Sequence, residues 1–304
     1  MFYLDIFKAL VYTAVFSLLA TPLDFKLAPA IGAIDVPKDA RRMHTRPIPR
    51  IGGISVFTSF VIFSLIFCRD IAPDLICLLS GAIFVVVLGI ADDALGLSAK
   101  VKLTVQVLSA VFTVSGMFFY YDMGIFLATF GVLWLLTLTN AHNFIDGLDG
   151  LCTGISISEA IGLSVLFFTR GEISLGYTAM ILAGACVGFF PYNEKNAKIF
   201  IGDTGATFLG FTLGALSFRF LLSSRSISAL ISMCLIFSIP LCDLAFAVTR
   251  RIYHKKSVFC SDRSHIHHIL ADSTLGHRKA SLFLRYISLL SSVTGVLFAL
   301  FFHR

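Results

Sequence analysis

The sequence predicts an all-α, polytopic integral membrane protein that forms a single domain over residues 1–304. Of its 304 residues, 57% are hydrophobic and 14% are charged, and the mean hydropathy is +0.88. Soluble domains contain about 45–50% apolar and about 25% charged residues. A water-exposed globule could not cover so much apolar surface, because it needs a charged exterior. The composition therefore argues against a soluble enzyme, a disordered chain and a secreted disulfide scaffold.

About ten apolar stretches are long enough to cross a hydrocarbon layer of about 30 Å as helices. Helices are expected because lipid offers no partner to unpaired backbone groups. The first stretch does not resemble a cleaved signal peptide, since no basic segment precedes it and it carries Asp5. In chain order, the expected spans are residues 4–28, 51–68, 75–91, 101–120, 125–140, 151–168, 173–191, 206–222, 228–249 and 281–302.

Lysine and arginine gather on alternate connections between these spans. Of the 24 basic residues, 17 lie in residues 35–50, 92–102, 141–150, 192–205 and 250–285, and six lie on the opposite side, which includes both termini. The positive-inside rule predicts that the first set is cytoplasmic and that both termini face outward. Membrane orientation explains the net charge of +6 better than a nucleic-acid partner does, so no nucleic acid is expected.

Acidic residues mark the inner end of the third span and the interior of two others. The adjacent carboxylates Asp92 and Asp93 repel each other at a membrane boundary unless a cation or a proton lies nearby, although a solvated helix end is the plainer alternative. An acid within a span costs at least about 2.5–3.5 kcal/mol unless it is paired. Glu159 therefore needs a structural or functional partner, and Pro240 could break the ninth span and expose Asp243 to water.

A second cluster follows the fifth span. Asn143, Asp146 and Asp149 are three residues apart, which would place them on one face of a helix. Amide and carboxylate oxygens in such an array suit Mg²⁺ or Mn²⁺. Gly147 and Gly150 would let a ligand approach the backbone closely. The alternative is a polar turn between two spans.

The third cluster, Gly202-Asp203-Thr204-Gly205, precedes the eighth span. A turn of this kind presents free N–H groups and the positive end of the helix dipole, which together bind phosphate. Because the Asp203 carboxylate would repel phosphate, it fits better as a ligand of a bridging metal. The alternative is a helix cap.

Two further clusters lie in basic connections. His265, His267 and His268 follow Arg263, and histidines bind phosphate oxygens, move protons or bind metal. A structural zinc site and a surface cluster without function are the alternatives. The basic, proline-containing segment of residues 41–53 could hold anionic headgroups or could serve only to orient the protein in the membrane.

All five clusters fall on the side predicted to be cytoplasmic. Together they supply carboxylates for a metal, cations for phosphates and histidines for acid–base work. We infer a metal-dependent reaction that joins a soluble phosphorylated donor to a lipid phosphate. A transporter of divalent cations or phosphate is the alternative from another class, but transporters place polar groups near the bilayer midplane, often in repeated halves, and no repeat is visible.

In this order the motifs resemble those of the polyprenyl-phosphate N-acetylhexosamine-1-phosphate transferases, over nearly the whole chain. The resemblance implies transfer of a sugar 1-phosphate from a UDP-sugar to undecaprenyl phosphate, with release of UMP, in the bacterial plasma membrane. The matching segments are Pro47–Gly53, Gly89–Asp93, Asn143–Gly150, Phe200–Gly205 and Ser264–His268, together with Pro240, Asp243, Arg250 and Arg251.

The His-Ile-His-His form of the histidine motif is similar to that of the N-acetylglucosamine-1-phosphate transferases, which start O-antigen, common-antigen or teichoic-acid assembly. Phospho-N-acetylmuramoyl-pentapeptide transferases usually carry three successive histidines, and that activity ranks lower. Another UDP-N-acetylhexosamine stays open as the donor, because Ala206 and Asn196 depart from the family pattern. A homodimer is a further option for the assembly.

The resemblance also implies residue roles. Asp203 would be the main Mg²⁺ ligand, with Asn143 or Asp146 as the second, and Mn²⁺ could replace Mg²⁺. Asp92 would position or deprotonate the lipid phosphate with support from Asp93. The residues implied to bind substrate are Lys102 near the phosphates, Asp149 and Phe200 at the uracil, Asn193 at the nucleotide, and Arg263, His265, His267 and His268 at the diphosphate.

Overall fold

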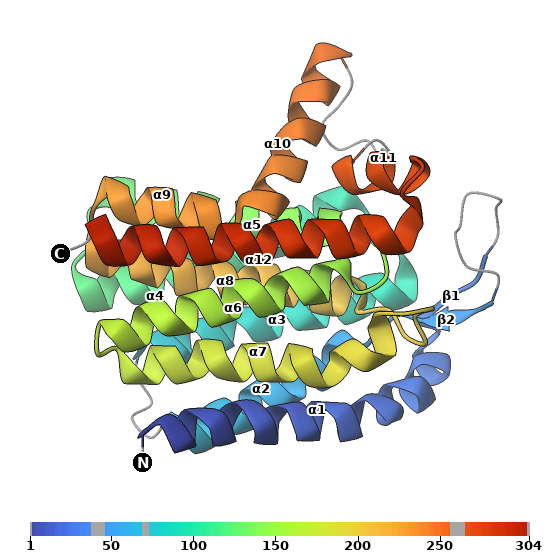
Figure 1. Ribbon diagram of the computed structural model, residues 1–304, viewed down its shortest axis with the longest axis horizontal. Coiled ribbons are helices and arrows are strands. Elements are labelled where there is room, and N and C mark those ends of the chain that lie inside the picture. Colours follow the sequence, from blue (N-terminus) through green and yellow to red (C-terminus); the bar gives the residue numbers. More distant parts are fainter. Residues whose placement is uncertain (1, 38–45, 69–72, 256–264, 303–304) are drawn as a thin grey trace.

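The computed structural model describes residues 2–37, 46–68, 73–255 and 265–302, and its long helices run side by side (Figure 1). The all-α fold predicted from composition is confirmed. In chain order the elements are α1 (Phe2–Ile31), β1 (Ile34–Asp35), β2 (Ile48–Pro49), α2 (Gly53–Phe67), α3 (Pro73–Leu95), α4 (Ala99–Tyr121), α5 (Ile125–Ile145), α6 (Leu151–Thr169), α7 (Ile173–Asn193), α8 (Gly202–Ser224), α9 (Ile227–Ile236), α10 (Ser238–Tyr253), α11 (Ile266–Asp272) and α12 (Gly276–Phe302). Among the described residues, the only sheet is a two-stranded antiparallel one in which Ile34 of β1 pairs with Pro49 of β2.

Helix α8 forms the centre of the bundle and packs against α3 and α5. In its most apolar stretch 94% of the residues are buried, whereas the corresponding share is 22% in α1 and 28% in α12, which lie on the outside. Glycines allow the close packing of α8. A side chain at Gly210 would come within 2.4 Å of the carbonyl oxygen of Leu138 in α5. The site described below is built at the first turn of this central helix.

Eight of the described helices are long and apolar enough to cross a membrane, and α2 is a shorter apolar helix. The ninth expected span, residues 228–249, is broken, as Pro240 indicated it could be, but Asp243 is buried and not exposed to water. That segment bends by 84° between α9 and α10, and α10 leaves the bundle (Figure 1). The break places Pro240 in the first turn of α10, where a residue without an N–H is tolerated, rather than in a helix interior.

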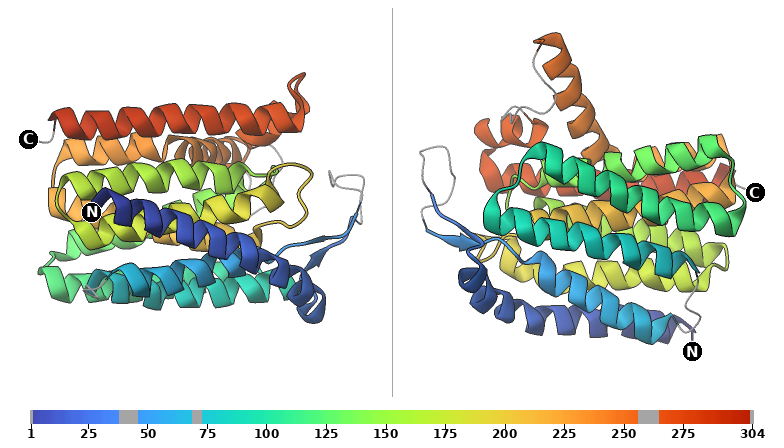
Figure 2. Two further views of the ribbon diagram at one scale, coloured as in Figure 1. Left: turned by 60° about the horizontal axis from the view of Figure 1, so that its bottom comes forward. Right: turned by 180° about the vertical axis from the view of Figure 1, so that it is seen from behind.

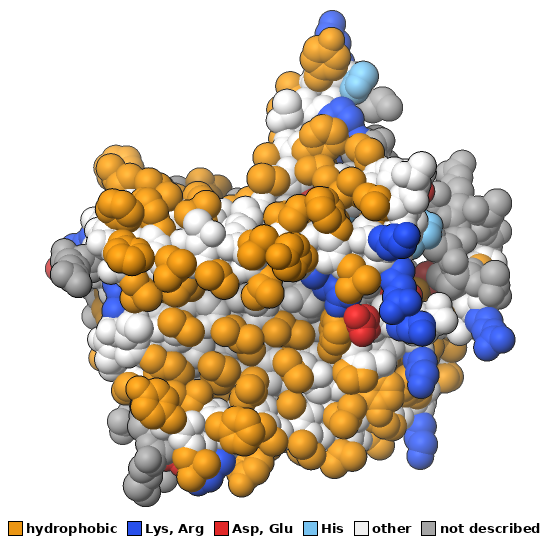
Figure 3. Space-filling model, viewed as in Figure 1, with side chains coloured by type: hydrophobic (Ala, Val, Ile, Leu, Met, Phe, Trp, Pro, Cys, Tyr) orange, Lys and Arg blue, Asp and Glu red, His pale blue; other side chains and the backbone are white. Residues whose placement is uncertain are grey.

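The two ends of the bundle differ in polarity. The start of α1 and the end of α12 lie at one end, and the β1–β2 hairpin and α11 lie at the other (Figures 1 and 2). On the face drawn in Figure 3, hydrophobic side chains cover most of the bundle, whereas lysines and arginines gather at the hairpin end and at the tip of α10. The clustering of charge at one end agrees with the sequence. That this end faces the cytoplasm stays a prediction.

Candidate active site

A cavity of about 1230 Å³ opens at the hairpin end of the bundle. Its walls come from the hairpin, the α5–α6 and α7–α8 connections, the first turn of α8, and helices α11 and α12. Segments far apart in the sequence therefore meet in one hollow. The predicted site residues that line it are Asn143, Asp146, Asp149, Asn193, Phe200, Asp203 and His268.

A lysine joins two of the predicted carboxylates behind the cavity wall. Lys102 Nζ donates to Asp92 Oδ2 at 2.8 Å and to Asp203 Oδ2 at 2.5 Å. Asp92 Oδ1 also accepts from the backbone N–H of Leu97 at 2.7 Å. The ammonium group offsets the repulsion between carboxylates from α3 and α8. The sequence prediction that Asp92 needs a nearby cation is met by Lys102.

Asp93 holds the first turn of α8. Its side chain is fully buried, and Oδ1 accepts from Arg50 Nε at 3.0 Å and from the backbone N–H of Asp203 at 3.1 Å. Oδ2 accepts from the backbone N–H and the hydroxyl of Thr204 at 2.9 and 2.7 Å. A carboxylate from α3 therefore caps α8. The expectation that this turn leaves its N–H groups free for phosphate is wrong at Asp203 and Thr204, because Asp93 already accepts from both.

Three motif glycines make this junction possible. Gly202 has φ of +69°, and a side chain there would come within 1.9 Å of the carbonyl oxygen of Arg50. Side chains at Gly89 and Gly53 would come within 2.4 Å of Thr204 Cα and 2.2 Å of Gly205 N. Backbone atoms cannot move aside as the end of a flexible side chain can. These glycines fix how closely α3 and α2 approach the start of α8.

Asp146 faces the cavity, and no lysine or arginine of the described residues forms an ion pair with it. Burial raises its pKa well above the ordinary value, and the carboxylates of Asp203 and Asp93 raise it further, against a smaller lowering by Arg50. Among the described residues, none donates a hydrogen bond to Asp146. A cation near Asp146 and Asp203 would stabilise both carboxylates, and Asn143 adds an amide oxygen to the same wall. This donor set fits Mg²⁺ or Mn²⁺.

The predicted shared helical face of Asn143, Asp146 and Asp149 is wrong. Helix α5 ends at Ile145, so Asp146 is its C-terminal cap and Asp149 lies in the turn before α6. Gly150 has φ of +66°, which this turn requires, and a side chain at Gly147 would collide with His267. Both glycines are therefore explained by the packing of the protein itself, without a ligand. The three polar residues still line one cavity, because the turn folds back along it.

Two predicted nucleotide contacts also anchor the α7–α8 connection. Asp149 Oδ2 accepts from the backbone N–H of Ala197 at 3.0 Å. The buried Asn193 side chain accepts from the Thr153 hydroxyl at 3.0 Å and donates to the carbonyl oxygen of Ile199 at 3.1 Å. These bonds set the position of Phe200 at the cavity wall. Their contacts with a nucleotide stay predictions.

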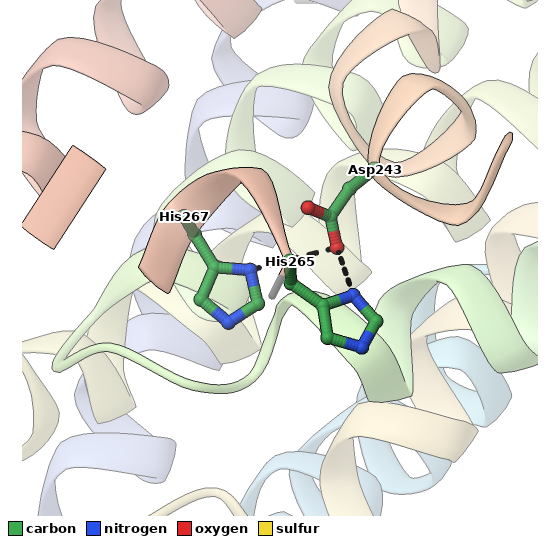
Figure 4. Close-up of side chains that lie close together, drawn as sticks. All are labelled: Asp243, His265 and His267. Carbon is green, nitrogen blue, oxygen red and sulfur yellow. Dashed lines mark hydrogen bonds and ion pairs between the residues drawn. The ribbon is translucent and has the colours of Figure 1, made fainter. Parts of the chain in front are cut away.

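The histidine motif divides between two places. His268 lines the cavity. His265 and His267 are buried and bond Asp243 (Figure 4), and the ring of His267 packs behind the cavity wall against His268 and Gly147. Arg263 lies outside the described residues. The predicted contacts of Arg263, His265 and His267 with a diphosphate therefore stay predictions.

Helix α12 supplies a cavity wall that sequence reasoning missed. His277, Arg278, Ser281 and Arg285 line the cavity, and Arg285 Nη2 bonds Glu194 Oε1 at 3.0 Å. A side chain at Gly154 would come within 2.3 Å of Arg285 Cδ, so this glycine gives the arginine its path across α6. The only sequence signal was the basic start of the last span, which is also typical of membrane orientation.

Glu159 has a structural partner inside the bundle, which was one of the two expected possibilities. Its Oε2 lies 2.8 Å from Nε2 of His142, and Nδ1 of that ring bonds the carbonyl oxygen of Leu138 at 2.9 Å. Both side chains are fully buried. The pair joins α5 to α6, and His142 directly precedes Asn143 in the last turn of α5.

Comparison with known proteins supports the resemblance seen in the motifs. The model of glycosyl transferase family 4 matches residues 75–221. A probable undecaprenyl-phosphate N-acetylglucosaminyl 1-phosphate transferase of Bacillus subtilis is 34% identical over 92% of this chain and 81% of its own. Undecaprenyl-phosphate alpha-N-acetylglucosaminyl 1-phosphate transferases of Thermotoga maritima and Escherichia coli are 32% and 26% identical, over 85% and 96% of this chain and 79% and 83% of their own. With this identity over most of its length, the chain belongs to glycosyl transferase family 4.

Proposed function

We propose that this protein transfers N-acetylglucosamine 1-phosphate from UDP-N-acetylglucosamine to undecaprenyl phosphate. One observation carries the proposal. Carboxylates from α3 and α8 meet around Lys102, and one of them, Asp203, lines a large cavity at the charged end of a membrane bundle. A soluble nucleotide sugar could enter such a cavity from water, while the lipid substrate stays in the bilayer. The names of the relatives supply the transferred group and the lipid acceptor, and the resemblance of the motifs implies a UDP-sugar as the donor.

Mg²⁺, or Mn²⁺ in its place, would be held by Asp203 with Asn143 or Asp146. All three line the cavity and offer oxygen atoms, the ligands that these ions prefer. The bound ion would supply positive charge to the diphosphate of the donor. The uncompensated carboxylate of Asp146 supports this placement, because burial and like charge hold its pKa well above the ordinary value.

The reaction needs positioning and charge stabilisation more than proton transfer. An oxygen of the lipid phosphate attacks the phosphorus next to the sugar, the bond between this phosphorus and the bridging oxygen breaks, and UMP leaves with the bridging oxygen. A phosphate monoester has a second pKa of about 6, so its oxygen is already ionised near neutral pH. Asp92, held by Lys102 with Asp93 behind it, would therefore mainly place the attacking phosphate.

The remaining roles follow the arrangement of the cavity. Phe200 would stack on the uracil, with Asp149 and Asn193 fixing the loop beside it. His268 would contact the diphosphate from the cavity wall. Function requires the cavity to open on the cytoplasmic side of the bacterial plasma membrane, because UDP-sugars are made in the cytoplasm.

The test is a transfer assay with the purified full chain. Radiolabelled UDP-N-acetylglucosamine is incubated with undecaprenyl phosphate and Mg²⁺, and label in the lipid extract is measured together with released UMP. We expect both products in equal amounts, their loss on chelation, and no product from Asp203→Asn. Uptake of label into vesicles without lipid product would overturn the proposal in favour of transport. Parallel assays with other UDP-N-acetylhexosamines test the donor sugar.

A further inference from the structure

We propose that Asp243, His265 and His267 form a second metal site, which takes a zinc-class divalent ion and is separate from the oxygen-rich site at Asp203. The three residues come from two elements outside the central bundle. Asp243 lies on α10, just after the 84° bend, and the histidines lie at the start of α11. All three are buried.

The ligand atoms converge on one point. Asp243 Oδ2 lies 2.8 Å from His265 Nδ1 and 3.5 Å from His267 Nδ1, and one ligand atom from each residue lies within 4.8 Å of the other two. Figure 4 shows both imidazole rings presenting a nitrogen toward the same carboxylate oxygen. Zinc bonds of about 2.0–2.2 Å can be made from atoms this close with small side-chain movements.

His267 provides an independent sign of a missing ligand. The residue is 1% exposed, and neither ring nitrogen makes a hydrogen bond within the described structure; Nδ1 has only the 3.5 Å ion pair with Asp243, and Nε2 has no polar partner there. Buried polar groups are nearly always partnered. A small cavity of about 30 Å³ lies against His267 and Asp243 and is bordered otherwise by mostly aliphatic side chains. An ion there would give the ring the partner that the protein does not supply.

Charge points the same way. Asp243 is 2% exposed, and no lysine or arginine of the described residues forms an ion pair with it. A buried carboxylate needs a cation. Two imidazole nitrogens and one carboxylate oxygen suit zinc and its neighbours, whereas Mg²⁺ prefers oxygen ligands. Binding would replace the proton between His265 and Asp243 and release it to solvent.

Such an ion would lock α11 onto α10. Asp243 Oδ1 already accepts from the backbone N–H of Ile266 at 2.7 Å, so the junction is partly formed by the protein alone. His268, the next residue after His267, lines the active-site cavity. The metal would therefore set the position of this cavity wall without touching substrate.

The test uses the full chain, purified in detergent with a tag that contains no histidine. After EDTA treatment and desalting, the protein is incubated with Zn²⁺ in excess Mg²⁺, desalted again and assayed by elemental analysis. We expect about one zinc per chain for the wild type, and affinity lowered by at least about 10-fold in His267→Ala and His265→Ala. His268→Ala is the matched control and should keep the zinc. Asp203→Ala should also keep the zinc while losing transfer, which separates this proposal from the proposed function.

Cobalt and melting measurements guard against misfolded variants. Co²⁺ bound to the wild type should give visible absorption bands that Zn²⁺ abolishes, and Zn²⁺ should raise the melting temperature of the wild type but not of His267→Ala. The proposal is overturned if the wild type retains no zinc and shows no cobalt bands. It is overturned equally if both histidine variants bind as much zinc as the wild type, because the zinc would then be held elsewhere and not by His265 and His267.

Discussion

Asp93 accepts a hydrogen bond from the backbone N–H of Asp203, although 110 positions separate them in the chain. The same carboxylate binds the backbone and hydroxyl of Thr204 and the guanidinium of Arg50. The inner end of α3 thereby fixes the first turn of α8, and with it the residue proposed to hold the metal. Within the acidic pair, Asp93 has the structural task and Asp92 faces Lys102.

Replacement of Asp93 tests this division. Asp93→Asn keeps one acceptor oxygen but turns an NH2 group toward donors that the carboxylate now satisfies, and leaving a buried donor without an acceptor costs about 1–3 kcal/mol. Melting followed in detergent should show this loss of stability, together with much lower transfer activity. Asp92→Asn is the paired control, and it should lower activity with a smaller change in melting. Equal melting of the two variants would contradict the separation of tasks.

Lys102 offers a test of electrostatics with a close control. Lys102→Gln leaves the carboxylates of Asp92 and Asp203 without the ammonium that lies between them. We expect kcat to fall about 10²–10³-fold, as when a preorganised charge stabiliser is removed. Lys100, exposed one half-turn earlier on α4, is the control, and Lys100→Gln should retain activity. Similar kinetics for both variants would remove Lys102 from the site.

Asp146 predicts opposite effects on stability and activity. Its folded-state pKa is raised, so the ionised side chain opposes folding, and this penalty grows as the pH rises above about 4, the ordinary pKa of an aspartate. Asp146→Asn should therefore melt higher than the wild type at pH 7 without Mg²⁺, and the difference should shrink as the pH falls toward 4. The variant should be inactive and insensitive to added Mg²⁺. Lower stability at pH 7 would contradict the burial argument.

Gly89 tests the close approach of α3 to α8. Gly89→Ala would bring a methyl group within 2.4 Å of Thr204 Cα, and overpacking of this kind costs about 1–3 kcal/mol. Thermal unfolding should show the loss. Gly124→Ala provides the comparison, because no atom lies within 4 Å of the added methyl and φ there is −69°. An unchanged melting temperature in Gly89→Ala would show that the helices can separate without cost.

Local properties of the sequence were enough to predict most of the spans and the end of the molecule where the site lies. Apolar length identifies spans, and the alternating charge of the connections predicts that Asp92, Asp146 and Asp203 lie at the same end. The tasks within the site depend on contacts between distant segments. No local pattern distinguishes Asp92 from Asp93, or shows that α5 stops at Ile145.

The break in the ninth span and the contribution of α12 show the same limit. Pro240 marks a weak point, but the bend at Phe237 depends on how α9 and α10 pack. Arg285 reaches the cavity only because Gly154 leaves a path across α6. A pairwise fit between two helices has no signature in either helix alone.

The deep enclosure of α8 has a consequence for biogenesis. Because 94% of the residues in its most apolar stretch are buried, this part of α8 has almost no lipid-facing side in the finished protein. Most of its contacts are with α2, α3, α5 and α6, which precede it in the chain and are therefore synthesised before it. Translation from the N-terminus thus allows α8 to pack against helices that are already present, so that its threonines and serines are not left exposed to lipid.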